Sequence, residues 1–135
     1  DKNKIITPHI GEFHKIFPKI KKNLSNFNKA TKAAKVIKSN IILKGANTTI
    51  VSYNSKVVIN KHSSSELAVI GSGDVLSGLI VSLISEKKMN PFFAGCAATW
   101  LHGDIAKNHG KGLIAEDIVN GIPLALKRLE KWKTY

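Results

Sequence analysis

A glycine-rich turn stands directly before a helical pattern at the centre of this chain. The turn consists of Gly71, Ser72, Gly73 and Asp74. Its glycines allow the backbone to adopt a positive φ and to come close to a bound anion. The residues that follow place apolar side chains on one helix face, at Leu76, Leu79, Ile80 and Leu83. The free N–H groups of the turn and the positive end of the helix dipole therefore converge, which predicts an anion-binding site.

Asp74 supplies the carboxylate of this turn, and the residues alone support two interpretations of it. A carboxylate beside a bound phosphate is a natural general base. A carboxylate at the start of a helix can equally be an N-cap, which accepts hydrogen bonds from the first backbone N–H groups. Both interpretations remain open at this point.

The length of 135 residues and the hydrophobic content of 43% suit one domain, or part of one, that buries roughly two-thirds of its unfolded surface. The chain starts at Asp1 and enters a motif-like stretch almost at once, which favours part of a larger domain. Cys96 is the single cysteine, so no disulfide framework is expected, and no histidine is paired at metal-ligand spacing. We therefore expect no transition metal bound by protein ligands.

The net charge of +12 would attract polyanions. Its lysines are scattered along the chain, however, and aromatic residues do not alternate with them as stacking platforms for bases would. This pattern favours a solvated lysine-rich surface over a nucleic-acid interface. No apolar run is long enough to cross a membrane, and the first residues lack an apolar signal segment, so a soluble cytoplasmic protein is expected.

Strand signals precede the glycine turn, and helical patterns follow it. Short strands are expected at residues 5–6 and 41–43, and a hairpin at residues 48–53 and 56–59. Helices are expected at residues 11–17, at residues 28–38, after the glycine turn, at residues 90–105 and from residue 115 onwards. In the last helix, Ile118, Ile122 and Leu126 should face inward, and Pro123 should kink or break the helix. This succession predicts a layered α/β domain with a ligand at the loops beyond the strand ends.

Three further positions carry groups that could contact a ligand. The loop after the first strand holds His9 and Glu12, which could bind a polar ligand, although a surface histidine beside a helix-capping glutamate explains them equally. Lys44 follows a strand that should be buried, so its ammonium could meet phosphates. His102 lies in an alanine-rich helix, where a structural role is the more common one.

In their order along the chain, these motifs resemble those of the ADP-dependent NAD(P)H-hydrate dehydratases, a branch of the ribokinase-like superfamily. The segments that carry the resemblance are residues 7–12, 43–48, 71–78, 101–103, 112–117 and 122–123. They span nearly all of this chain but only the C-terminal half of the family's domain. The resemblance therefore implies the C-terminal half of a ribokinase-like three-layer αβα fold, with residues 1–135 as one portion of a single domain.

The resemblance also implies a reaction, in which a hydro-lyase restores hydrated NADH or NADPH by loss of water at the expense of ADP or ATP. Asp74 would be the catalytic acid/base residue and would contact the hydrated nucleotide together with His9. The anion hole would consist of Gly71, Ser72 and Gly73. The AMP part of the nucleotide would be held by Lys44, Gly45, Ala46, Asn47, Thr48 and Gly73. Mg²⁺ would accompany the phosphates.

The partners that the resemblance implies are hydrated NADH or NADPH, an NAD(P)H-hydrate epimerase as a separate protein or a fused domain, and further copies of the same chain in a homo-oligomer. The chain departs from the family at residues 62–65, which read His-Ser-Ser-Ser where the family usually carries Thr-Gly-Asn-Pro. The loop keeps its length but loses its rigid residues. The chain also departs from the family in that the N-terminal half of the family's domain is not part of it.

Two alternative functions remain open from the sequence. The glycine-aspartate turn is shared across the superfamily, so a kinase of a small molecule such as a vitamin precursor would carry it as well. A basic module without catalytic activity would account for the charge, and its binding to random DNA would then depend on salt.

Overall fold

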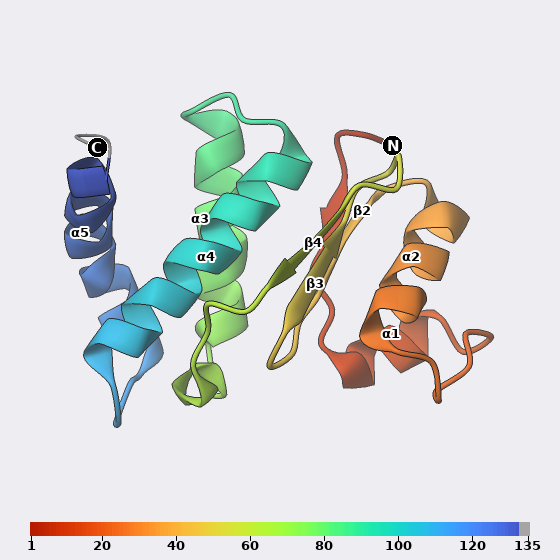
Figure 1. Ribbon diagram of the computed structural model, residues 1–135, viewed down its shortest axis with the longest axis horizontal. Helices are drawn as coiled ribbons and strands as arrows, with labels where there is room; N and C mark the ends of the chain where they lie inside the picture. The colour runs from red at the N-terminus through yellow and green to blue at the C-terminus, as the bar shows by residue number, and fades with distance from the viewer. Residues whose placement is uncertain (133–135) are drawn as a thin grey trace.

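The computed structural model describes residues 1–132 and shows a mixed four-stranded sheet between layers of helices (Figure 1). The strands lie in the order β1 (Ile5–Ile6), β2 (Asn40–Leu43), β3 (Thr48–Val51) and β4 (Val57–Asn60). The pairing of β1 with β2 is parallel, whereas the pairings of β2 with β3 and of β3 with β4 are antiparallel. This arrangement confirms the α/β prediction.

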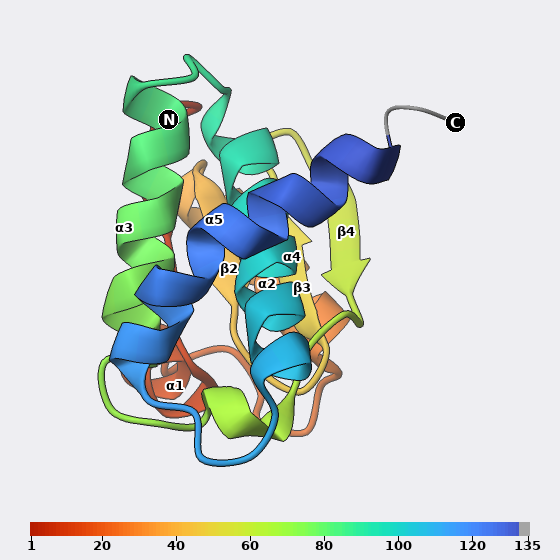
Figure 2. The ribbon, with the colours of Figure 1, turned by 90° about the vertical axis from the view of Figure 1, so that its left-hand side faces the viewer.

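Helices cover both faces of the sheet. One face is covered by α1 (Ile10–Ile16) and α2 (Asn26–Ile37), and the other by α3 (Ser72–Ser85) and α4 (Pro91–His109). The last helix, α5 (Ala115–Trp132), packs against α3 and α4 on the side away from the sheet, as Figure 2 shows. A short 3₁₀ helix, η1 (Ser65–Leu67), precedes the glycine turn. The predicted three layers are therefore present.

The central strand β2 is buried on both faces, as its continuous apolar run predicted. Because side chains alternate along a strand, Ile41 and Leu43 pack against α1 and α2, and Ile42 packs against α3 and α4. The hairpin prediction is also confirmed, but the connection from β3 to β4 is longer than the predicted two residues. It consists of residues 52–56, in which the Ser55 N–H donates to the Ser52 carbonyl at 3.0 Å and Ser55 adopts a φ of 69°.

The helix starts follow their capping residues closely. Ser25 caps α2 by accepting a hydrogen bond from the Asn28 backbone N–H, and α2 therefore begins two residues before the predicted position. Asn90 caps α4 in the same way, with Pro91 at the first helical position as predicted.

The last helix differs from its prediction in two respects. Of the kink or break expected at Pro123, the break is absent, because α5 continues to Trp132. Proline has no backbone N–H, so the Val119 carbonyl lacks its usual hydrogen-bond donor within the helix. Val119 and Pro123 are both exposed, and water can therefore donate to that carbonyl. Leu126 is 47% exposed rather than inward-facing, and Ala125 is buried in its place. Seven residues after Ile118 bring a side chain back to the same helix face more closely than eight residues do.

Cys96 lies in the second turn of α4 and packs against the apolar cluster between the sheet and α3 and α4. Burial raises the pKa of its thiol to about 11, so the thiolate is scarce at neutral pH. None of the helices within residues 1–132 combines the length and the apolar character that a membrane span requires.

Candidate active site

The glycine turn forms the N-terminus of α3. Gly71 is the N-cap residue with a φ of 85°, a conformation that glycine adopts without strain, and Ser72 is the first helical residue. Asp74 lies at the third helical position and is exposed. It is therefore not the cap residue, and its carboxylate has no hydrogen bond or ion pair with any other residue among 1–132. Its charge is available to a ligand at the positive end of the helix.

Lys44 approaches this turn from the end of β2. The parallel pairing of β1 and β2 continues past both strands through a bridge between His9 and Lys44, in which the Lys44 N–H donates to the Pro8 carbonyl at 2.9 Å. The ammonium then reaches the first turn of α3, because a Cβ added at Gly73 would stand 3.1 Å from Lys44 Nζ. A cation at the positive end of a helix is unfavourable alone and is relieved by an anion.

Two adjoining cavities meet at Lys44 and Gly73, which line both. The first has a volume of about 570 Å³ and contains the carboxylate of Asp74. It is lined by Ile6, Thr7, Pro8, Glu12, Lys15, Ile16, Lys44, Gly71, Gly73, Asp74 and Ser77. The second has a volume of about 800 Å³. It is lined by His9, Ile10, Lys44, Gly45, Ala46, Thr48, Ser63, Ser64, Ser65, Leu67, Ala68, Val69, Ser72, Gly73, Leu76, Thr99 and His102.

The residues expected to hold AMP gather at the second cavity, with one exception. Gly45, Ala46 and Thr48 line it together with Lys44, whereas Asn47 lines neither cavity. Thr48 orders this loop, because its hydroxyl donates to the Gly45 carbonyl at 3.1 Å. Of the expected anion hole, Ser72 faces the second cavity, Gly71 the first, and Gly73 both.

Asp74 lines the first cavity and His9 the second, and the two cavities adjoin at Lys44 and Gly73. His9 is the N-cap of α1, where its Nδ1 accepts hydrogen bonds from the backbone N–H groups of Gly11 at 3.0 Å and Glu12 at 3.3 Å. The Glu12 carboxylate accepts from the His9 backbone N–H at 2.8 Å, and chiefly this bond lowers the pKa of Glu12. The capping role considered for this pair is therefore present.

His102 supports the glycine turn, which agrees with the structural role expected for it, although the sequence did not indicate its partner Ser72. Its Nε2 donates to the Ser72 carbonyl at 2.9 Å, and the Ser72 hydroxyl lies 3.2 Å from the same nitrogen. Burial lowers the pKa of His102; the bond to Ser72 acts in the opposite direction, and the charge of Lys44 lowers it further. The imidazole is neutral at pH 7 and fixes the first residue of α3. The motif of residues 101–103, which contains His102, was the available signal.

No group of three or more histidine, cysteine, aspartate or glutamate side chains within residues 1–132 is arranged to hold a metal ion.

The fold and the site define an α/β domain in which a glycine turn at a helix N-terminus and a lysine at a strand end lie side by side at one cleft, the arrangement in which α/β domains commonly bind anions. A sequence profile of the NAD(P)H-hydrate dehydratase family matches residues 1–123. The chain belongs to this family.

Three relatives illustrate the similarity. The ADP-dependent (S)-NAD(P)H-hydrate dehydratase of Nitrosopumilus maritimus is 31% identical over 137 residues, which cover 97% of this chain and 47% of that protein. A bifunctional NAD(P)H-hydrate repair enzyme of Gloeobacter violaceus is 38% identical over 120 residues, covering 87% of this chain and 22% of that protein. The solved ADP/ATP-dependent NAD(P)H-hydrate dehydratase of Bacillus subtilis superposes with a TM-score of 0.80 at 27% identity.

The Bacillus subtilis protein was co-crystallised with ATP and Mg²⁺ and soaked with CoA. The superposition covers 92% of this chain and 48% of that protein. This chain thus spans less than half the length of each of these relatives, and it corresponds to roughly the C-terminal half of their dehydratase domains.

Proposed function

We propose that the protein carrying this chain is an ADP-dependent (S)-NAD(P)H-hydrate dehydratase, which restores NADH or NADPH from the hydrated cofactor. One observation supports this function above the others. The ammonium of Lys44 and the first turn of α3 converge on one position, and the unpartnered carboxylate of Asp74 lies in that same turn. This arrangement combines an anion site with an available base.

The described residues fit a nucleoside diphosphate. The backbone N–H groups of Gly71, Ser72 and Gly73 are at the start of a helix, where they have no carbonyl partner within the helix. The Ser72 N–H donates instead to the Val69 carbonyl over a long distance of 3.3 Å, a bond that a phosphate oxygen would replace. They would bind phosphate oxygens together with Lys44. The second cavity, which begins at Lys44 and Gly73 and runs along the loop after β2, would hold the AMP part.

Asp74 would act on the proton of the substrate hydroxyl. Hydroxide is a poor leaving group, and a phosphoryl group on its oxygen converts it into a good one. Asp74 would take the hydroxyl proton while that oxygen bonds to the terminal phosphorus and the bond from phosphorus to AMP breaks. Departure of phosphate, with loss of one ring proton, restores the ring double bond, so that the elements of water leave within the phosphate.

The N-terminus of α3 would stabilise the charge that develops on the phosphoryl oxygens. Mg²⁺ bound to the phosphates would supply further neutralising charge. The proposal also includes a partner, an NAD(P)H-hydrate epimerase that is either a separate protein or a fused domain. It further includes assembly into a homo-oligomer and a cytoplasmic location. The bifunctional relatives support the epimerase partner, because their name gives them a second activity in the repair of the same cofactor.

The test is an assay of the native protein that carries this chain. Incubation with hydrated NADPH, ADP and Mg²⁺ should regenerate the ultraviolet absorbance of the reduced nicotinamide ring, with AMP and phosphate formed in equal amounts. Omission of ADP is the control, and it should abolish recovery. A folded protein that binds ADP but restores no absorbance would refute the proposed function.

The same assay separates this function from that of a small-molecule kinase. A kinase leaves a stable phosphorylated alcohol, whereas the dehydratase releases free phosphate and leaves no phosphoryl group on its product. Mass analysis of the organic product distinguishes the two outcomes.

A further inference from the structure

The loop between β4 and η1 forms one wall of the second cavity without regular structure of its own. Ser63, Ser64 and Ser65 line the cavity. Residues 61–64 belong to no helix or strand. Within the loop, the Ser63 N–H donates to the Lys61 carbonyl at 3.1 Å, and the Ser64 hydroxyl accepts from the Glu66 N–H at 3.2 Å. These local bonds do not fix the loop to the rest of the domain.

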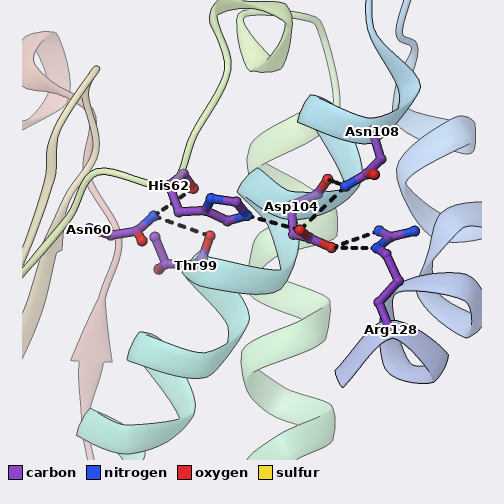
Figure 3. Close-up of polar contacts among 6 residues, drawn as sticks. All are labelled: Asn60, His62, Thr99, Asp104, Asn108 and Arg128. Carbon is purple, nitrogen blue, oxygen red and sulfur yellow. Dashed lines mark hydrogen bonds and ion pairs between the residues drawn. The ribbon is translucent and has the colours of Figure 1, made fainter. Parts of the chain in front are cut away.

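His62 ties this loop to α4. Its ring stacks on Trp100 with centroids 4.7 Å apart and an interplanar angle of 14°. Its Nε2 lies 2.9 Å from Asp104 Oδ1, as Figure 3 shows. The other carboxylate oxygen of Asp104 accepts from Arg128 of α5, at 2.6 Å from Nη2 and 3.1 Å from Nε. The loop is thereby joined to two helices through one carboxylate.

The backbone of His62 is held as well. The Asn60 side-chain amide donates to the His62 carbonyl at 3.1 Å. On the opposite side, Gly103 lets α4 touch the same carbonyl, because an added Cβ would stand 1.8 Å from that oxygen. Both the ring and the peptide of His62 are therefore in contact with the core of the domain.

Asp104 is nearly buried and remains ionised. Burial by itself would raise the pKa of its carboxyl, but the hydrogen bonds from His62 and Arg128 outweigh that effect and lower the pKa. The Asn108 side-chain amide lies 3.3 Å from Oδ1 as a weaker third partner. A charged acceptor with well-aligned donors gives hydrogen bonds stronger than those between neutral groups.

We propose that His62 is a positioning residue that holds the serine loop of residues 63–65 against the nucleotide cavity. This inference rests on the proposed function for its nucleotide. Ser64 and Ser65 are held only by the single turn of η1, and no proline restricts the backbone of residues 61–64, so an unanchored loop would have to be ordered when the nucleotide binds. The anchor between His62 and Asp104 orders it in advance and thereby strengthens binding.

The experiment compares three variants of the native protein. His62→Ala removes the anchor, and His62→Gln keeps a side-chain N–H that can reach Asp104. His109→Ala is the matched control, because it removes a second histidine near an aspartate, 3.5 Å from Asp117, at the end of α4 and outside both cavities. Backbone hydrogen exchange is followed without nucleotide, and ADP affinity is measured by titration calorimetry.

We expect His62→Ala to accelerate exchange within residues 61–69 while α3 keeps its protection. The dissociation constant for ADP should rise about tenfold, the factor that corresponds to one lost hydrogen bond to a charged group. Turnover at saturating ADP should change by less than about twofold. His62→Gln should recover part of the lost affinity, and His109→Ala should match the wild type.

Three results would contradict the proposal that His62 anchors the loop. Exchange in residues 61–69 could stay at the wild-type rate, exchange could rise equally in α3 and α4, or ADP affinity could remain unchanged although the loop exchanges faster. The exchange measurement needs no nucleotide. It therefore decides on the anchor even if the wild type restores no NADPH and the proposed function fails.

Discussion

Asp74→Asn is expected to reduce turnover of hydrated NADPH by about a thousandfold, within the range for loss of a general base. The amide has the same shape as the carboxylate but cannot take the hydroxyl proton. The fold should be retained, because Asp74 is exposed and bonds no other residue among 1–132. ADP affinity should fall little or even rise, since one negative charge near the phosphates is removed. Steady-state kinetics and calorimetry measure the two quantities.

Glu116→Gln provides the control for this prediction. Glu116 is an exposed acidic residue in the first turn of α5, so its substitution makes the same chemical change at a helix start outside both cavities. Its turnover should equal that of the wild type. If Asp74→Asn keeps near-normal turnover, Asp74 is not the base.

Gly103→Ala is expected to destabilise the domain more than any other single-methyl addition considered for this site. The new Cβ would stand 1.8 Å from the His62 carbonyl oxygen, 2.8 Å from its carbon and 3.0 Å from Ser63 Cα. All three are backbone atoms, so either the loop or α4 must move. Overpacking of this kind costs about 3 kcal/mol, and thermal or denaturant unfolding measures the loss.

Gly78→Ala is the matched substitution in α3. A Cβ there meets no atom within 4 Å, and the position is exposed in a helix interior. Alanine should therefore stabilise the protein by about 1 kcal/mol through its helix propensity. Equal stability of the two variants would show that α4 and the loop do not touch as described.

The parts of the fold that the sequence predicted are those decided by neighbouring residues. The apolar run of β2, the hairpin of β3 and β4 and the Asn90 cap each depend on a few neighbouring positions, and each appears as expected. The exposed proline in α5 shows the limit of such rules, because solvent can satisfy the carbonyl that a buried proline would leave without a partner.

In the candidate site, too, features that depend on neighbouring residues could be predicted, and features that depend on long-range packing could not. The glycine turn and its helix could be predicted from adjacent residues. The approach of Lys44 to Gly73 depends on how β2 lies beside α3, and only the family resemblance indicated it. Asp104 joins His62, which is 42 positions away in the sequence, to Arg128, which is 24 positions away. No local sequence pattern indicates contacts between such distant residues.

A crystal structure of the native protein with ADP and Mg²⁺ tests most directly whether the start of α3 is a phosphate site. We predict phosphate oxygens within hydrogen-bonding distance of the backbone N–H groups of residues 71–73 and of Lys44 Nζ, with Asp74 facing the terminal phosphate. ADP bound with its phosphates away from this turn, or density for ADP at another surface, would contradict the account.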